Sequence, residues 1–236
     1  MGTTSEDLSK ALLDVRRAHR ILYAYQRRML DLVTFIGQQL TKNSELAVNG
    51  FKHFSYPVPG SWNNISPLHK MWAWDYLYSY LFEYYLGEKE TDNGGAYALS
   101  LIQYSDTGYF DQEEKEEGTR LELEKFKPEE ESSSKLLFFL EYKRKDSKWE
   151  WGNGTSLEKI VLDKKVGSKK HEKEVRNIEG VTQILYPVSL EEFINIETTL
   201  EVLREFRSYC QEQDIHVFNN LTLEPTCTPT SSSSEE

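Results

Sequence analysis

The N-terminal segment carries an uninterrupted heptad pattern of apolar side chains. Apolar residues recur at alternating intervals of three and four, which is the spacing of a helix that packs along another helix. This seam consists of Leu8, Ala11, Val15, Ala18, Leu22, Tyr25, Met29, Leu32 and Ile36. It predicts one continuous helix from about residue 5 to residue 41, roughly 54 Å long because each helical residue rises about 1.5 Å.

The predicted helix is long for a compact domain, so we expect part of its apolar face to be covered by another protein chain. That chain is either a partner protein or a second copy in a homo-oligomer. The seam as a whole predicts the interface, and its larger side chains are the expected contact residues: Leu8, Val15, Leu22, Tyr25, Met29, Leu32 and Ile36.

A second helix is predicted over residues 67–86. Ser66 followed by Pro67 is typical of an N-cap with proline at the first helical position, and Gly87 is a suitable terminator. The two helices would pack as an antiparallel hairpin, which defines a first region at residues 1–87.

The apolar period changes to two after Gly95, which predicts a sheet region at residues 88–224 with a polar, disordered tail at 225–236. The charged segments 111–117, 127–134 and 163–179 are expected to be loops. A Ser189–Glu192 capping box predicts a C-terminal helix, and residues 215–223 are a candidate edge strand. The predicted strands cover residues 96–104, 119–127, 135–143, 149–151, 157–162 and 181–186.

These patterns together predict an α+β fold. It comprises an N-terminal antiparallel helical hairpin packed on a mainly antiparallel sheet of five or six strands, with a capped C-terminal helix.

The formal net charge of −11 is unevenly distributed, because residues 1–44 contain seven Lys or Arg against four Asp or Glu. The acidic remainder opposes nucleic-acid binding by the body of the protein, since phosphates would be repelled. The sequence contains no apolar run long enough to span a membrane and no signal-peptide pattern at its start. We therefore expect a cytoplasmic protein that does not bind membranes.

One short motif indicates possible enzymatic chemistry. Glu141-Tyr142-Lys143 resembles the E-x-K half of the PD-(D/E)xK nuclease motif, in which the acidic residue binds Mg²⁺ and the lysine orients the attacking water. The resemblance implies catalytic roles for Glu141 and Lys143, with Asp111, Glu124 and Glu83 as further metal ligands. No Pro-Asp pair precedes the motif, and a strand that ends in charged residues as it reaches solvent produces the same pattern.

The sequence favours a non-enzymatic protein that binds other chains through its first helix. No cofactor is expected, and Mg²⁺ would be required only by the nuclease alternative. A second alternative is a small-ligand-binding protein whose aromatic pocket is lined by Trp62, Trp72 and Trp74.

Overall fold

The computed structural model describes a framework of helices and strands. The described residues are 4–41, 55–56, 81–91, 94–108, 126–145, 172–178, 180–219 and 223. The predicted strands at 149–151 and 157–162 lie outside these ranges, as do residues 119–125 of another.

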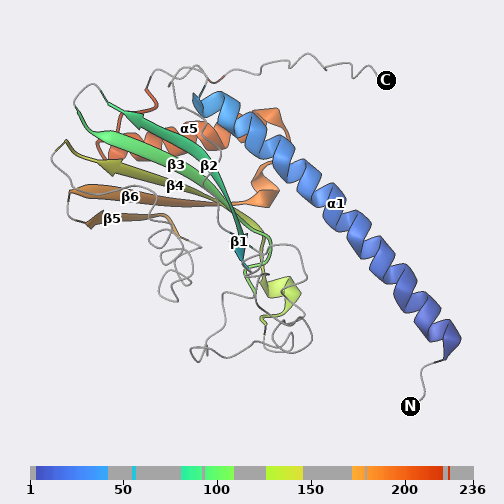
Figure 1. Cartoon of the computed structure of the whole chain (residues 1–236). Coiled ribbons are helices and arrows are strands. Elements are labelled where there is room, and N and C mark those ends of the chain that lie inside the picture. The colour runs from blue at the N-terminus through green and yellow to red at the C-terminus, as the bar shows by residue number, and fades with distance from the viewer. Residues whose placement is uncertain are drawn as a thin grey trace, which may run out of the picture.

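Two long helices flank one face of an antiparallel sheet, which makes the fold α+β as predicted (Figure 1). Within the described residues the sheet has six strands in the order β1-β2-β3-β4-β6-β5, and every neighbouring pair is antiparallel. The elements are α1 (Ser5–Thr41), β1 (Ser55–Tyr56), β2 (Leu81–Glu90), β3 (Ala96–Tyr104), the 3₁₀ turn η3 (Glu129–Glu131), β4 (Lys135–Lys143), β5 (Glu174–Ile178), β6 (Val181–Ser189), the 3₁₀ turn η4 (Leu190–Glu192) and α5 (Ile196–Glu212).

The central strands confirm the predictions that rested on period-two patterns. Strands β3 and β4 have the predicted bounds, and β6 begins at the predicted residue and continues to Ser189. All three are buried along nearly their whole length. Strands that are buried on both faces are easy to identify in a sequence, because nearly all of their residues are apolar.

Strand β2 corrects the sequence prediction. Residues 81–86 form the start of β2 and not the end of a helix, while residues 67–80 of the predicted helix lie outside the described residues. The sequence predicts a helix here because apolar residues occupy both sides of the strand, which hides the period of two. Tyr84 and Leu86 lie on one side, and Tyr85 lies on the other beside Glu83. Gly87, at a φ of 120°, continues the strand through a bulge and does not terminate a helix.

Strand β5 was missed because it lies in the charged segment that was predicted to be a loop. It is an edge strand, and its one strand neighbour in the described sheet is β6. Edge strands tolerate charged residues well, so such a strand gives little apolar signal.

The C-terminal helix is confirmed, although it begins later than its predicted cap. Ser189 caps only η4, and α5 starts after Asn195, whose side chain accepts a hydrogen bond from the Thr198 amide in a complete capping box. The candidate edge strand fails over its described part, because residues 215–219 form no strand. Ile215 and Phe218 are nevertheless buried.

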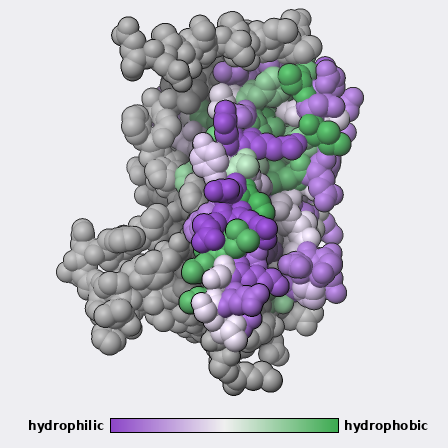
Figure 2. Space-filling view, turned by 90° about the vertical axis from the view of Figure 1, so that its right-hand side faces the viewer, coloured by the Kyte–Doolittle hydropathy of each residue, from purple (hydrophilic) through white to green (hydrophobic). Residues whose placement is uncertain are grey.

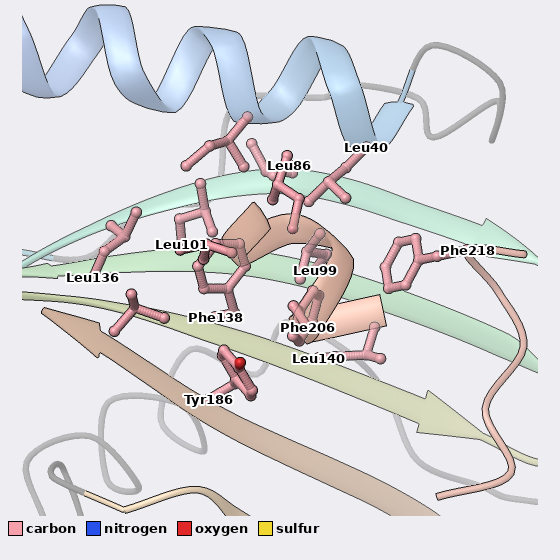
Figure 3. Packing of buried hydrophobic residues seen from close by; sticks show 14 of the residues in the cluster. Leu40, Leu86, Leu99, Leu101, Leu136, Phe138, Leu140, Tyr186, Phe206 and Phe218 are labelled. Atoms are coloured by element: carbon pink, nitrogen blue, oxygen red, sulfur yellow. The ribbon is translucent and has the colours of Figure 1, made fainter. Parts of the chain in front are cut away.

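The core lies between the sheet and the two helices. Phe206 of α5 packs on Phe138 of β4 and Tyr186 of β6, with ring centroids 4.8 Å and 5.4 Å away. From α1, only the C-terminal part reaches this core, where Leu40 lies over Leu86 (Figure 3). Only the C-terminal half of α1 therefore contributes buried residues to the core.

Candidate protein-interaction surface on helix α1

The N-terminal half of α1 projects away from the sheet (Figure 1). Residues 4–24 are all exposed, whereas the buried residues of the helix lie from Met29 onwards. Eight large apolar residues of the helix remain exposed to solvent: Leu8, Leu12, Leu13, Val15, Ile21, Leu22, Tyr23 and Leu30. Hydrophobic residues accordingly lie among hydrophilic ones on this side of the molecule (Figure 2).

The exposed side chains include the first part of the predicted seam. Leu8, Val15 and Leu22 are 54%, 52% and 45% exposed and occupy the same heptad position. Isolated surface leucines need no explanation, but a row of them at heptad spacing is the pattern of a helix–helix contact. Leu12 and Ile21 widen the row on either side.

The second part of the seam is covered by this chain's own fold. Met29 and Ile36 are buried, and Tyr25 and Leu32 are half-buried against the core. The residues available to another chain are therefore Leu8, Val15 and Leu22, with Tyr25 at the boundary. The sequence pattern alone gave no sign of this division.

A polar cluster holds α1 at the point where it leaves the sheet. Gln103 of β3 is fully buried, and its Nε2 donates to Tyr25 Oη at 3.1 Å and to Gln26 Oε1 at 3.3 Å. Its Oε1 accepts from Tyr84 Oη at 2.7 Å, and Gln26 Nε2 donates to the same tyrosine oxygen at 2.8 Å. Buried polar groups with several partners hold a defined geometry, so this cluster fixes the direction of the projecting half.

Burial and hydrogen bonding have opposite effects on the pKa of Tyr25 at this boundary. Burial raises the pKa of its phenol, while the hydrogen bonds that it makes with Ser105 and Gln103 oppose that increase. The phenol therefore stays protonated at neutral pH and acts as a hydrogen-bonding group.

An open groove of about 710 Å³ lies beside this boundary. Three seam residues, Tyr25, Met29 and Leu32, form part of its lining, and residues in and after η4 form another part. Arg28 also lines the groove, and its Nη2 donates to the carbonyl oxygen of Phe193 at 3.1 Å. Further lining residues are Ser105, Asp106, Glu129, Ser132, Ser133, Ser134, Leu190, Glu191 and Ile194. The seam thus runs from the free half of the helix directly into the groove.

The charges on the projecting half lie mainly off the seam. Between Val15 and Leu30 the helix carries five arginines and no acidic residue. Arg17 Nη1 forms an exposed ion pair with Asp14 Oδ1 at 3.0 Å, a contact that contributes little to stability. The arginines therefore keep the helix hydrated without interrupting its apolar row.

The residues of the nuclease hypothesis are only partly described. Glu83 in β2 and Glu141 in β4 are buried on the sheet face opposite the helices, and half-buried Lys143 follows Glu141 on that face. Asp111 and Glu124 lie outside the described residues. The register places Glu83 opposite Ile102 and Glu141 opposite Ala98, which separates them by about 13 Å along the strands and about 10 Å across them.

Each of these two carboxylates is held by its own neighbour. Ser100 Oγ donates to Glu83 Oε1 at 2.6 Å, and Gln183 Nε2 donates to Glu141 Oε2 at 2.8 Å. Among the described residues, no group of three or more His, Cys, Asp or Glu side chains is arranged to hold a metal ion. The described geometry therefore gives no support to a shared Mg²⁺ ion, and the nuclease site remains a prediction.

The remaining sequence predictions concern the aromatic pocket and the membrane. Trp62, Trp72 and Trp74 lie outside the described residues. Of the helices in the described ranges, none combines the length and apolar character needed to cross a membrane.

Sequence reasoning missed the polar cluster and the groove. Gln103 lies within an apolar strand, and a buried glutamine in such a strand was the available signal, because a buried amide requires hydrogen-bond partners. The groove combines α1 with segments more than 70 residues away along the chain, such as Ser105 and Phe193. No local pattern encodes that juxtaposition.

Comparison with known families places the chain without assigning it an activity. The family model described as PM0109 matches residues 5–219. The chain belongs to this family. The match includes the seam, the sheet and α5, so the projecting helix lies within the part of the chain that defines the family. No curated protein and no solved structure matches the chain.

Proposed function

We propose that this PM0109-family protein is a non-enzymatic, cytoplasmic interaction or assembly protein that binds another protein chain through residues 5–24 of α1. The observation that carries the proposal is the division of the seam. One half is buried in the chain's own core, and the other half has the same spacing but is exposed.

Simple energetics make such binding reasonable. Complete burial of a Val, Leu or Ile side chain contributes about 1.5–3 kcal/mol. The five such residues that lie on the free seam or flank it are roughly half exposed: Leu8, Leu12, Val15, Ile21 and Leu22. If two such helices covered each other, burial would contribute on the order of 8–15 kcal/mol. Association itself costs about 4–15 kcal/mol. The two quantities are similar, so we expect binding that depends on protein concentration and is sensitive to a single seam substitution.

The polar cluster around Gln103 is a second observation that supports the proposal. A helix that only stabilised the fold could end where the sheet ends. Here buried hydrogen bonds fix the direction of the helix at the point where the free half begins. A projecting helix with a fixed direction presents its apolar row with less loss of entropy on binding.

Site-specific photo-crosslinking tests the proposal. A benzophenone amino acid is placed at Leu22 on the seam or, as the matched control, at Tyr23, which is 70% exposed and lies on a different side of the helix. We expect a discrete protein adduct from position 22, in cells or with the purified protein, and a much weaker one from position 23. Equal labelling from both positions, or no adduct from either, would show that the seam binds no protein.

A further inference from the structure

The free half of the seam alternates large and small residues in a regular way. Its first heptad position, a, is occupied by Leu8, Val15 and Leu22, and its fourth position, d, by Ala11 and Ala18. All of these positions are exposed. The alternation is informative because the relative direction of two helices decides which positions face each other.

Two parallel copies would place like positions together. Leu22 would then meet Leu22, and Ala18 would meet Ala18, so wide layers would alternate with underfilled ones. In an antiparallel pair, position a of one helix faces position d of the other. Val15 and Leu22 can then each face an alanine, which gives central layers of nearly constant volume.

We propose that the chain bound by the seam is a second copy of this protein, aligned antiparallel and centred between Arg16 and Arg17. This inference rests on the proposed function and specifies its partner. In this register Val15 faces Ala18 of the second copy, Leu22 faces Ala11, and Leu8 faces Tyr25. By symmetry each contact occurs twice.

The adjacent registers are less favourable. A shift of one heptad in one direction places Leu22 opposite Thr4, at the start of the helix. A shift in the other direction places Ala11 opposite Met29, which is already 3% exposed in this chain's own core. Of these three registers, only the central one places both Val15 and Leu22 opposite an alanine, and Leu8 then meets Tyr25 at the edge of the exposed half.

The groove extends the same contact surface. Because Tyr25, Met29 and Leu32 line it, the first turn of one helix would arrive at the groove of the other copy. Ile194, which is 71% exposed, lies at that groove and would be covered. Asp7 would lie close to Arg28, which also lines the groove, and this places opposite charges together at each end of the pair.

The described parts of the two sheets would lie apart in this arrangement. In each copy the sheet begins to cover the helix at Tyr25, and in the antiparallel pair that residue lies opposite Leu8 of the other copy. The two sheets would therefore stand at opposite ends of a shared segment of about 27 Å, the length of 18 helical residues.

Disulfide trapping tests the register. The background is Cys227→Ser in the chain of 236 residues, which leaves only Cys210, a buried thiol. Chains carrying Leu22→Cys and Ala11→Cys, distinguished by a C-terminal tag, are mixed and oxidised gently. We expect the mixed disulfide to exceed either homodimer by about tenfold, because Cα atoms more than about 7 Å apart cannot be bridged.

Two further mixtures guard against a variant that folds poorly. Val15→Cys with Ala18→Cys examines the layers nearest the centre and should give the same result. Ser9→Cys with Leu22→Cys is the matched control and should give little mixed disulfide, since Ser9 is off the seam. If homodisulfides dominate instead, the antiparallel register is wrong while self-association stands.

Sedimentation equilibrium separates this inference from the proposed function. We expect a monomer–dimer equilibrium for the wild type and the Tyr23→Asp control, and a monomer for Leu22→Asp. A wild-type protein that stays monomeric throughout the accessible concentration range would overturn the second copy as partner. A specific adduct from position 22 with a different protein would then still support the proposed function.

Discussion

Helices α1 and α5 have similar amphipathic patterns but different relations to the sheet. The α5 helix has 17 residues, about 25 Å, and its stripe of Leu200, Leu203, Phe206 and Cys210 is at most 2% exposed. The α1 helix has 37 residues, about 55 Å, whereas nine-residue strands span only about 30 Å. The comparison shows that an apolar stripe predicts burial only over the length that the fold can cover.

The largest effect on stability is expected from a substitution at the centre of α5, where the apolar stripe is fully covered. Phe206 is fully buried between Phe138, Tyr186 and Phe218, so Phe206→Ala should lower the free energy of unfolding by about 3–5 kcal/mol. Urea denaturation measures this change. The exposed Glu201→Ala on the same helix is the control and should change stability by less than about 0.5 kcal/mol.

The two halves of α1 should respond differently to the same kind of truncation. Ile36 is fully buried, so Ile36→Ala should cost about 2–5 kcal/mol of unfolding free energy. Leu22→Ala should change the stability of the isolated chain by less than about 0.5 kcal/mol, since the Leu22 side chain is exposed. Denaturation at a protein concentration low enough to prevent association compares the two. Equal losses would mean that the free half belongs to the core.

The boundary between the halves depends on Gln103. Gln103→Leu removes one partner of Tyr84 Oη and one partner of Tyr25 Oη, which should cost about 1–3 kcal/mol. It should also raise the pKa of Tyr25, because the hydrogen bond from Gln103 now lowers it. Spectrophotometric titration of the tyrosines measures the second effect, and exposed Gln38→Leu on α1 is the control. An unchanged Tyr25 pKa would contradict the described cluster.

The sequence predicted those elements in which a residue and its near neighbours decide the structure. The uniform apolar character of Leu136–Leu140 identified β4, and the 3.6-residue stripe that includes Leu203 and Phe206 identified α5. Strand β2 was misread because its aromatic residues fit either period. For the candidate surface, the sequence predicted the whole seam, but only the packing of distant strands shows that Met29 and Ile36 are used internally and Leu22 is not. The same holds for Gln103, whose partners in α1 are more than 70 residues away.

The smallest expected effect lies at the first turn of α1, far from the sheet. Asp7 Oδ2 accepts hydrogen bonds from the hydroxyl and the amide of Thr4 at 2.7 Å and 3.0 Å, and these bonds lower the pKa of the Asp7 carboxyl below its usual 3.8. Because the folded pKa is the lower one, the stabilising effect of this contact is present above the usual pKa and is lost as the pH falls through the folded value. Thr4→Ala should bring the pKa of Asp7 back towards 3.8, as measured by carboxyl ¹³C NMR titration. The exposed Thr34→Ala on the same helix is the control and should leave the Asp7 pKa unchanged. A simultaneous decrease in self-association would mean that the first turn of the helix belongs to the dimer contact, as the antiparallel register requires when Asp7 lies beside Arg28.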